Sequence, residues 1–182
     1  ADNLFHDLSR ISDEEMASSE TALYSRSSSR SCPTINIVIY DSITLHRKIE
    51  LDFGSGCVGI DGKTRQGKLD CEISGKYMES GTVITYEPDN YYVNNYKIEG
   101  KKTVTNNGRN SSNNLSYSIK VENGNITTPD SLLITWESQR SREWTSGEST
   151  PIYIWDDEYS ISGSASGINQ NQRAYTVTIT DD

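Results

Sequence analysis

Between Leu45 and Ile73 the chain alternates apolar and polar residues with a period of two. Two arms carry the pattern, 45–53 and 69–73, and a glycine-rich connection that includes Asp61-Gly62 joins them. Because successive side chains of a strand point to opposite faces, this period predicts two strands, each with one buried and one solvated face. Such one-sided strands are typical of antiparallel sheets. The residues expected on the buried face are Leu45, Arg47, Ile49, Leu51, Phe53, Leu69, Cys71 and Ile73.

Short strands separated by turn residues are expected from Pro33 to the end of the chain. Segment 115–121 alternates most cleanly, and segment 33–41 is so apolar that we expect it in the centre of a sheet. Trp136 alternates in register with Leu132 and Ile134, which predicts a core position. Turns are expected at Pro88-Asp89-Asn90 and at Asn123-Gly124, and Asn106-Asn107-Gly108 is expected to begin a polar loop.

Three Ile-x-Gly triplets, at 73–75, 98–100 and 161–163, suggest bends or bulges within long strands. The whole pattern predicts an all-β fold, an antiparallel meander that forms a curled sheet, a half-barrel or a sandwich. Residues 32–182 form the predicted β domain.

Residues 1–31 have a different composition and are expected to form a leader outside the β domain. Ser12 and Glu15 have the spacing of a capping box, so we predict a short N-terminal helix over 12–25. The serine-rich segment 25–31 has the composition of a flexible linker.

Composition and charge exclude several classes of partner. The formal net charge of −9 argues against nucleic acid, whose phosphates attract a basic surface. No apolar run approaches the roughly 20 residues of a membrane helix, and no signal peptide is visible, so the chain is intracellular or the mature form of an exported protein. With no CxxC motif and one histidine, His46, after the leader, neither a metal site nor a cofactor is expected.

The three cysteines, Cys32, Cys57 and Cys71, allow two interpretations. All three can be buried thiols, because free cysteine behaves as a small apolar residue. Alternatively, Cys32 and Cys57 form one disulfide while Cys71 is a core residue on its strand.

Motifs of catalysis are incomplete, and we expect no catalytic residues and no enzymatic activity. Asp52-Phe53-Gly54 spells the metal-binding tripeptide of kinases, but the other kinase motifs are missing. Segment 163–167 has Ala165 where a nucleophile elbow needs serine. Arg140, Arg142 and Glu143 are interpreted as cross-strand charge pairs.

A candidate ligand site lies near the C-terminus. Trp144 and Trp155 flank a turn, and we expect both indoles to be exposed, beside the carboxylates Asp156 and Asp157. Exposed aromatic rings with neighbouring carboxylates are suited to stacking on and hydrogen bonding to a sugar. The simpler interpretation is a solvated acidic turn, which is the more common role of such charge runs.

The run ELDFGSGCVGIDGKTRQGKL at 50–69, together with IEGKKTVTN at 98–106, resembles a family of uncharacterised secreted lipoproteins of Bacteroidetes. The matching positions are Asp52, Phe53, Gly54, Gly56, Cys57, Gly59, Asp61, Gly62, Arg65 and Gly67. The resemblance implies export, a lipid anchor upstream of residue 1, a periplasmic or outer-membrane location and further strands beyond the C-terminus. It implies no particular activity.

These observations lead to two functional hypotheses. The first is a non-enzymatic domain of the cell envelope that binds another envelope protein or has a structural role. The second is a glycan-binding module of a polysaccharide-uptake system that uses Trp144, Trp155, Asp156 and Asp157.

Overall fold

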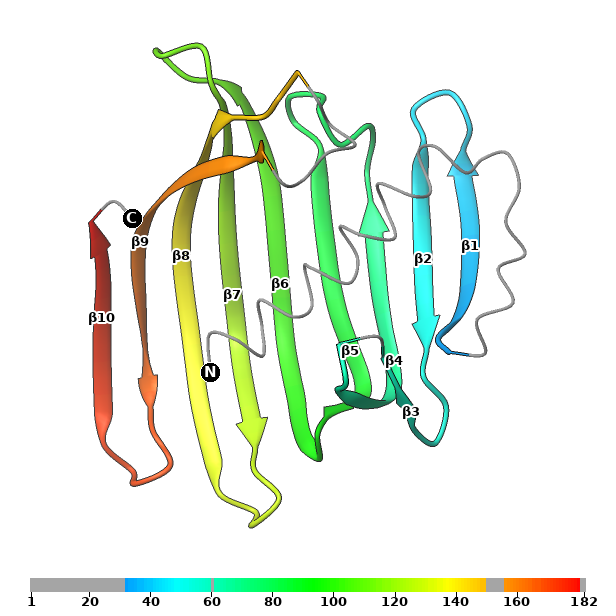
Figure 1. The fold of residues 1–182 in the computed structure, drawn as a ribbon, viewed down its shortest axis with the longest axis vertical. Helices are drawn as coiled ribbons and strands as arrows, with labels where there is room; N and C mark the ends of the chain where they lie inside the picture. The colour runs from blue at the N-terminus through cyan, green and yellow to red at the C-terminus, as the bar shows by residue number, and fades with distance from the viewer. Residues whose placement is uncertain (1–31, 60, 150–155, 181–182) are drawn as a thin grey trace.

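The computed structural model describes residues 32–59, 61–149 and 156–180, and all the secondary structure in these residues is β. Figure 1 shows the strands as one sheet. The predicted leader helix over 12–25 lies outside the described residues. No described segment is a helix that could cross a membrane. The strands are β1 (Thr34–Asp41), β2 (His46–Asp52), β3 (Cys57–Val58), β4 (Thr64–Ile73), β5 (Val83–Val93), β6 (Tyr96–Arg109), β7 (Leu115–Thr127), β8 (Leu133–Ser146), β9 (Glu158–Ile168) and β10 (Ala174–Thr180).

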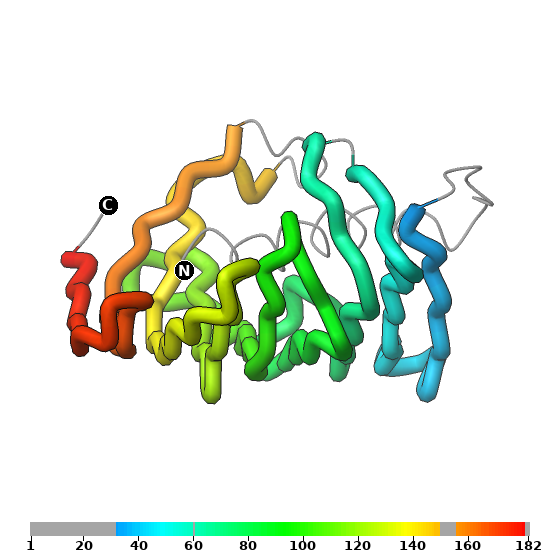
Figure 2. Tube along the Cα trace, turned by 90° about the horizontal axis from the view of Figure 1, so that it is seen from below, coloured from blue at the N-terminus to red at the C-terminus, as the bar shows by residue number. Residues whose placement is uncertain are grey.

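The sheet is an antiparallel meander, as the alternation predicted. Its order is β1-β2-β4-β5-β6-β7-β8-β9-β10, and the two-residue β3 pairs with β4. Figure 2 looks along the strands, which follow one another in chain order across the molecule. The expected half-barrel or sandwich is not found, because the ten strands form one open sheet that is neither closed nor strongly curled.

One face of the sheet carries the core. The inward residues of β2 are nearly inaccessible, and their cross-strand partners on β4 are equally buried: Ile49 lies opposite Cys71, and Leu51 opposite Leu69. Trp136 is buried, as its register predicted. We call this the core face. Its largest fully buried side chains are Leu51, Leu69, Cys71, Ile73, Tyr86, Tyr91, Val93, Ile98, Tyr117 and Ile126.

The opposite face is solvated and carries ion pairs between strands. Lys48 Nζ lies 2.7 Å from Asp70 Oδ2, and Lys68 Nζ lies 3.2 Å from Glu50 Oε1. These pairs are partly exposed and contribute little individually. They confirm the solvated face that was predicted for the 45–53 and 69–73 arms.

Two predicted turns and the predicted start of a loop are bulges inside long strands. The register shifts in β5 before Tyr91, in β6 between Asn106 and Gly108, and in β7 between Val121 and Gly124. Asn90, Gly108 and Asn123 have positive φ there. Turns and bulges both use this conformation, so the local sequence did not distinguish them. The expected bend at Gly100 is also found as a bulge.

The apolar composition of segment 33–41 predicted a central strand, and this prediction is wrong. Strand β1 lies at the edge of the sheet. Among the described strands it pairs with β2 alone, and all eight of its residues are exposed. A run of apolar residues indicates that a strand tends to be covered, but it does not show whether another strand of the same chain covers it.

A disulfide joins Cys32, just before β1, to Cys57 in β3, with the two Cα atoms 6.1 Å apart. This is the pairing of the second interpretation, and Cys71, which keeps its thiol, is fully buried on the core face. The disulfide links the start of the edge strand to the glycine-rich connection between β2 and β4.

Candidate binding site

At one end of the sheet, aromatic side chains on the core face surround the guanidinium of Arg142. Its Cζ lies 5.0 Å from the centre of the Tyr117 ring and 4.8 Å from that of Tyr159. Its Nη2 donates a hydrogen bond of 2.8 Å to the hydroxyl of Tyr77, whose ring stacks on Tyr117. Three strands and the β4–β5 connection are therefore held together around one cation.

Burial changes the acid–base properties of two of these tyrosines. Removal from water raises the pKa of Tyr117 and of Tyr159 well above the ordinary value, because the phenolate would lose its hydration. The positive charge of Arg142 acts in the opposite direction, but burial outweighs it. Both hydroxyls therefore stay protonated at physiological pH.

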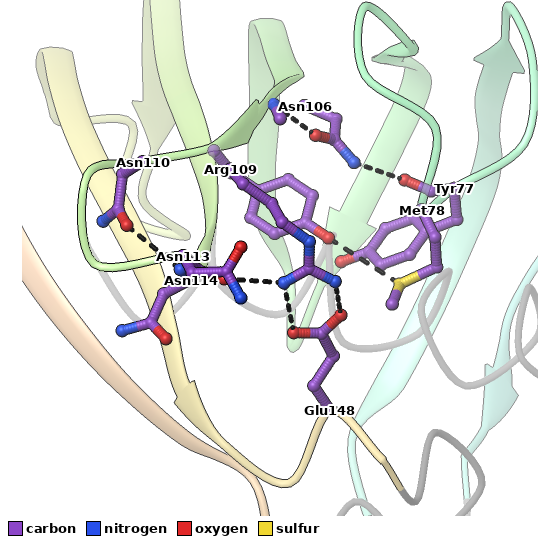
Figure 3. A network of polar contacts seen from close by, with 10 residues as sticks. Tyr77, Met78, Asn106, Arg109, Asn110, Asn113, Asn114 and Glu148 are labelled. Atoms are coloured by element: carbon purple, nitrogen blue, oxygen red, sulfur yellow. Dashed lines mark hydrogen bonds and ion pairs between the residues drawn. The ribbon is translucent and has the colours of Figure 1, made fainter.

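A polar group of side chains lies next to the tyrosines, at the ends of β6 and β8 (Figure 3). Arg109 forms a two-pronged ion pair with Glu148, in which Nη1 lies 3.0 Å from Oε2 and Nη2 bonds Oε1. Arg109 Nη1 also donates to the carbonyl of Asn113 at 2.7 Å. Because a guanidinium fixes both partners in its plane, this pair ties the β6–β7 turn to the β8–β9 connection.

The β6–β7 turn is held by its own asparagines. The Asn110 side-chain oxygen accepts hydrogen bonds from the backbone N–H groups of Ser112 and Asn114, both at 3.0 Å. Asn114 Nδ2 donates to Glu143 Oε1 at 2.8 Å. We call Arg109, Asn110, Asn113, Asn114 and Glu148 the Arg109 rim.

A third connection supports the rim from the other side. Asn106, which is buried, donates from Nδ2 to the carbonyl of Tyr77 at 2.9 Å and accepts from the N–H of Gly108 at 2.7 Å. The Tyr117 hydroxyl lies 4.0 Å from the sulfur of Met78. The rim therefore lies beside a packed, hydrogen-bonded base, which is the arrangement that holds a binding surface in one geometry.

Two of the four predicted ligand residues, Trp144 and Asp157, lie beside this base. Trp144 is 5% exposed, so the expected exposed indole is wrong, and its ring packs against Tyr159 at 5.7 Å. Asp157 is half-buried and accepts a hydrogen bond from the Tyr159 hydroxyl at 3.1 Å. Asp156 is exposed, and Trp155 lies outside the described residues.

Two buried polar atoms beside Tyr159 lack hydrogen-bond partners within the described part of the chain. They are Trp144 Nε1, which is a donor, and Asp157 Oδ1, which is an acceptor. Buried polar atoms in folded proteins are almost always paired. A hydroxyl group can serve as the acceptor for a donor such as Trp144 Nε1 or as the donor for an acceptor such as Asp157 Oδ1.

The other motifs of the sequence have structural roles. Asp52 of the Asp-Phe-Gly tripeptide accepts a hydrogen bond from the N–H of Gly54 at 2.8 Å, which closes the turn after β2. Asp61 binds both terminal nitrogens of the buried Arg65, at 2.9 and 2.7 Å. Within the three described ranges, no three acidic, His or Cys side chains are grouped as a metal ion would require.

The sequence did not point to most of this site. Arg142 was interpreted as one member of cross-strand charge pairs, yet it lies on the core face with Trp136 and Trp144, where tyrosine rings surround it. Even-numbered positions from 136 to 144 share that face, so the register of β8 contained this information. Arg109 and Glu148 are 39 residues apart, and no local pattern indicates such a contact.

Comparison of this chain with protein-family models, with curated proteins and with solved structures finds no match.

Proposed function

We propose that this protein is an exported, non-enzymatic domain of the cell envelope that acts by binding, with the Arg109 rim as its binding surface. The observation that carries the proposal is the rim itself, in which amide and charged groups are held in place beside a base of stacked tyrosines and Arg142. Groups held in place before binding lose little conformational entropy when a partner arrives.

Two further observations support an envelope location. The Cys32–Cys57 disulfide is consistent with an oxidising compartment outside the cytoplasm. The segments 50–69 and 98–106 resemble secreted lipoproteins of Bacteroidetes, and the resemblance implies a lipid anchor upstream of residue 1.

The unpaired atoms beside Tyr159 favour a second candidate, a glycan-binding module. A sugar presents hydroxyl groups that both donate and accept, so it offers partners to a donor such as Trp144 Nε1 and to an acceptor such as Asp157 Oδ1. In this case Trp144 contributes its N–H and not an exposed ring face. Trp155 and Asp156 stay predicted members of this site.

Sedimentation with isolated cell envelopes of a Bacteroidetes bacterium tests the proposal. The purified, oxidised protein is expected to pellet with the envelopes. The double variant Arg109→Ala/Glu148→Gln removes the ion pair of the rim, and we expect it to stay in the supernatant. The matched control, Lys120→Ala/Glu122→Gln, removes another exposed ion pair, 2.7 Å long and within β7, and should pellet like the wild type.

The treatment that abolishes binding identifies the partner. Loss of binding after protease treatment of the envelopes indicates a protein partner, whereas loss after periodate oxidation indicates a glycan. Equal pelleting of the wild type and the Arg109 variant would show that the rim is not the binding surface. A wild-type protein that stays in the supernatant would contradict the proposal as a whole.

A further inference from the structure

The outer edge of β1 has the properties of an interface. Ile35, Ile37 and Ile39 lie on the core face, because their partners across β2 are Leu51, Ile49 and Arg47. All three isoleucines are exposed, and so are Val38 and Tyr40. An edge strand that exposes apolar side chains and unpaired backbone groups readily pairs with another strand.

The usual protection of edge strands is confined to the two ends of β1. Pro33 precedes the strand, and a bulge at Tyr40 interrupts its register with β2. Segment 34–39 between them has no charged residue. Natural edge strands usually have a lysine, a proline or a bulge in such a position, so the middle of β1 is open to a partner.

The two edges of the sheet differ in chemistry. On β10, Tyr175, Val177 and Ile179 alternate with threonines, so its second face is polar. On β1 the isoleucines fill one face, and the other face exposes Val38 and Tyr40 beside Thr34 and Asn36. The edge of β1 is therefore the one that needs a covering strand.

We propose that β1 pairs antiparallel with β1 of a second copy of this chain, across a twofold axis at Ile37. This register places Ile37 opposite Ile37 of the other copy, and Ile35 opposite Ile39, so the core face continues as a row of isoleucines. The inference is independent of the binding function proposed above.

The strand selects this register. Moving the axis to residue 38 carries the bulge at Tyr40 further into the paired segment, opposite Asn36, where it would interrupt the ladder. Moving the axis to residue 36 places Ile39 opposite Pro33, which has no N–H for a ladder. With the axis at Ile37 the regular pairs cover the five residues 35–39, and the bulge at Tyr40 falls at the end of this segment, opposite Thr34.

A second copy fits better than a β1–β10 contact. β1 and β10 run in the same direction, since an even number of antiparallel steps separates them in the sheet. Joining β10 of one copy to β1 of the next would repeat without end as parallel pairs, whereas the twofold arrangement closes after two copies. An interface of one strand is small, so we expect a reversible dimer.

Sedimentation velocity of the full-length, oxidised protein over a range of concentrations tests the inference. We expect a monomer–dimer equilibrium for the wild type. Ile37→Lys places two ammonium groups opposite each other and should raise the dissociation constant about tenfold or more. Val177→Lys on β10 is the matched control, because Val177 is 46% exposed and Ile37 is 45% exposed, and it should dimerise like the wild type.

An engineered cysteine tests the register even if the lysine variant does not fold. Directly opposed residues have Cβ atoms about 4.5–5.5 Å apart, so mild oxidation should cross-link Ile37→Cys into a dimer and leave Val177→Cys monomeric. A wild type that is monomeric at every concentration, or an Ile37→Lys variant that dimerises normally, would overturn the inference. Cross-linking of Val177→Cys in preference to Ile37→Cys would also overturn it.

Discussion

Gly67 occupies the position in β4 where the register with β5 shifts, and no other residue fits there. Its φ is +78°, and a Cβ atom would lie 2.0 Å from the carbonyl oxygen of Asn90. Gly62 has almost the same φ, +75°, but has open space around the position of a Cβ. Replacing Gly62 by alanine therefore introduces backbone strain alone, whereas replacing Gly67 introduces the same strain together with a steric clash.

We expect Gly62→Ala to lower the free energy of unfolding by roughly 1–2 kcal/mol, the cost of the left-handed conformation. Gly67→Ala adds the displacement of β5, so we expect a loss of roughly 3 kcal/mol or more. Equilibrium denaturation of both variants measures the difference. Equal losses would mean that β5 moves away from Gly67 without cost.

Tyr117 and Tyr159 make stability depend on alkaline pH. Their pKa values are raised in the folded protein, while the unfolded chain has tyrosines with a pKa near 10. Below pH 10 both tyrosines are protonated in the folded and in the unfolded protein, so the free energy of unfolding does not change with pH through them. Above pH 10 the unfolded state loses protons first, so the free energy of unfolding should fall by up to about 1.4 kcal/mol per pH unit for each tyrosine.

Urea denaturation at several pH values measures this slope. Tyr117→Phe and Tyr159→Phe should each make it shallower than in the wild type. A slope unchanged in Tyr117→Phe would indicate that this hydroxyl is not buried in the folded protein.

At the scale of elements, the disulfide is the contact that holds the β1 edge to the rest of the sheet covalently. It closes a loop of 25 residues, for which the loss of chain entropy in the unfolded state predicts roughly 3–4 kcal/mol of stabilisation. We expect reduction to lower the free energy of unfolding by about this amount. The double variant Cys32→Ser/Cys57→Ser should be equally destabilised and should not respond to reductant.

A thiol count checks the pairing independently. Cys71 is fully buried, so the native protein should not react with a maleimide, and the unfolded, unreduced protein should react once. Three reactive thiols after unfolding would show that the disulfide is absent from the protein.

The strands could be predicted from the sequence wherever alternation is uninterrupted. Segments 46–52 and 115–121 show this, because their apolar residues are buried or half-buried on the side that their parity assigns. The errors occur where Asn or Gly takes a positive φ within a strand. At Asn123-Gly124 the chain needs the same local conformation for a turn as for a bulge, and the decision depends on pairing with β8.

At the scale of the whole molecule, the open sheet could not be predicted because closure depends on its edges. The apolar composition of β1 fits a central strand, and it fits equally well an edge strand that pairs with a second molecule. The candidate site had the same difficulty, since Arg142 and Tyr77 are 65 residues apart in the chain. Only the order of the strands brings them together.

The central claim is that the Arg109 rim binds a component of the cell envelope. Hydrogen exchange tests it most directly, because it locates the binding surface along the chain. Exchange is measured for the protein alone and for the protein bound to a solubilised envelope fraction. The account predicts slower exchange in residues 109–114, at the β6–β7 end of the sheet, and no change at Asn94 and Asn95 at the other end of β6 (Figure 1). Protection confined to Asn94 and Asn95, with none in 109–114, would contradict it.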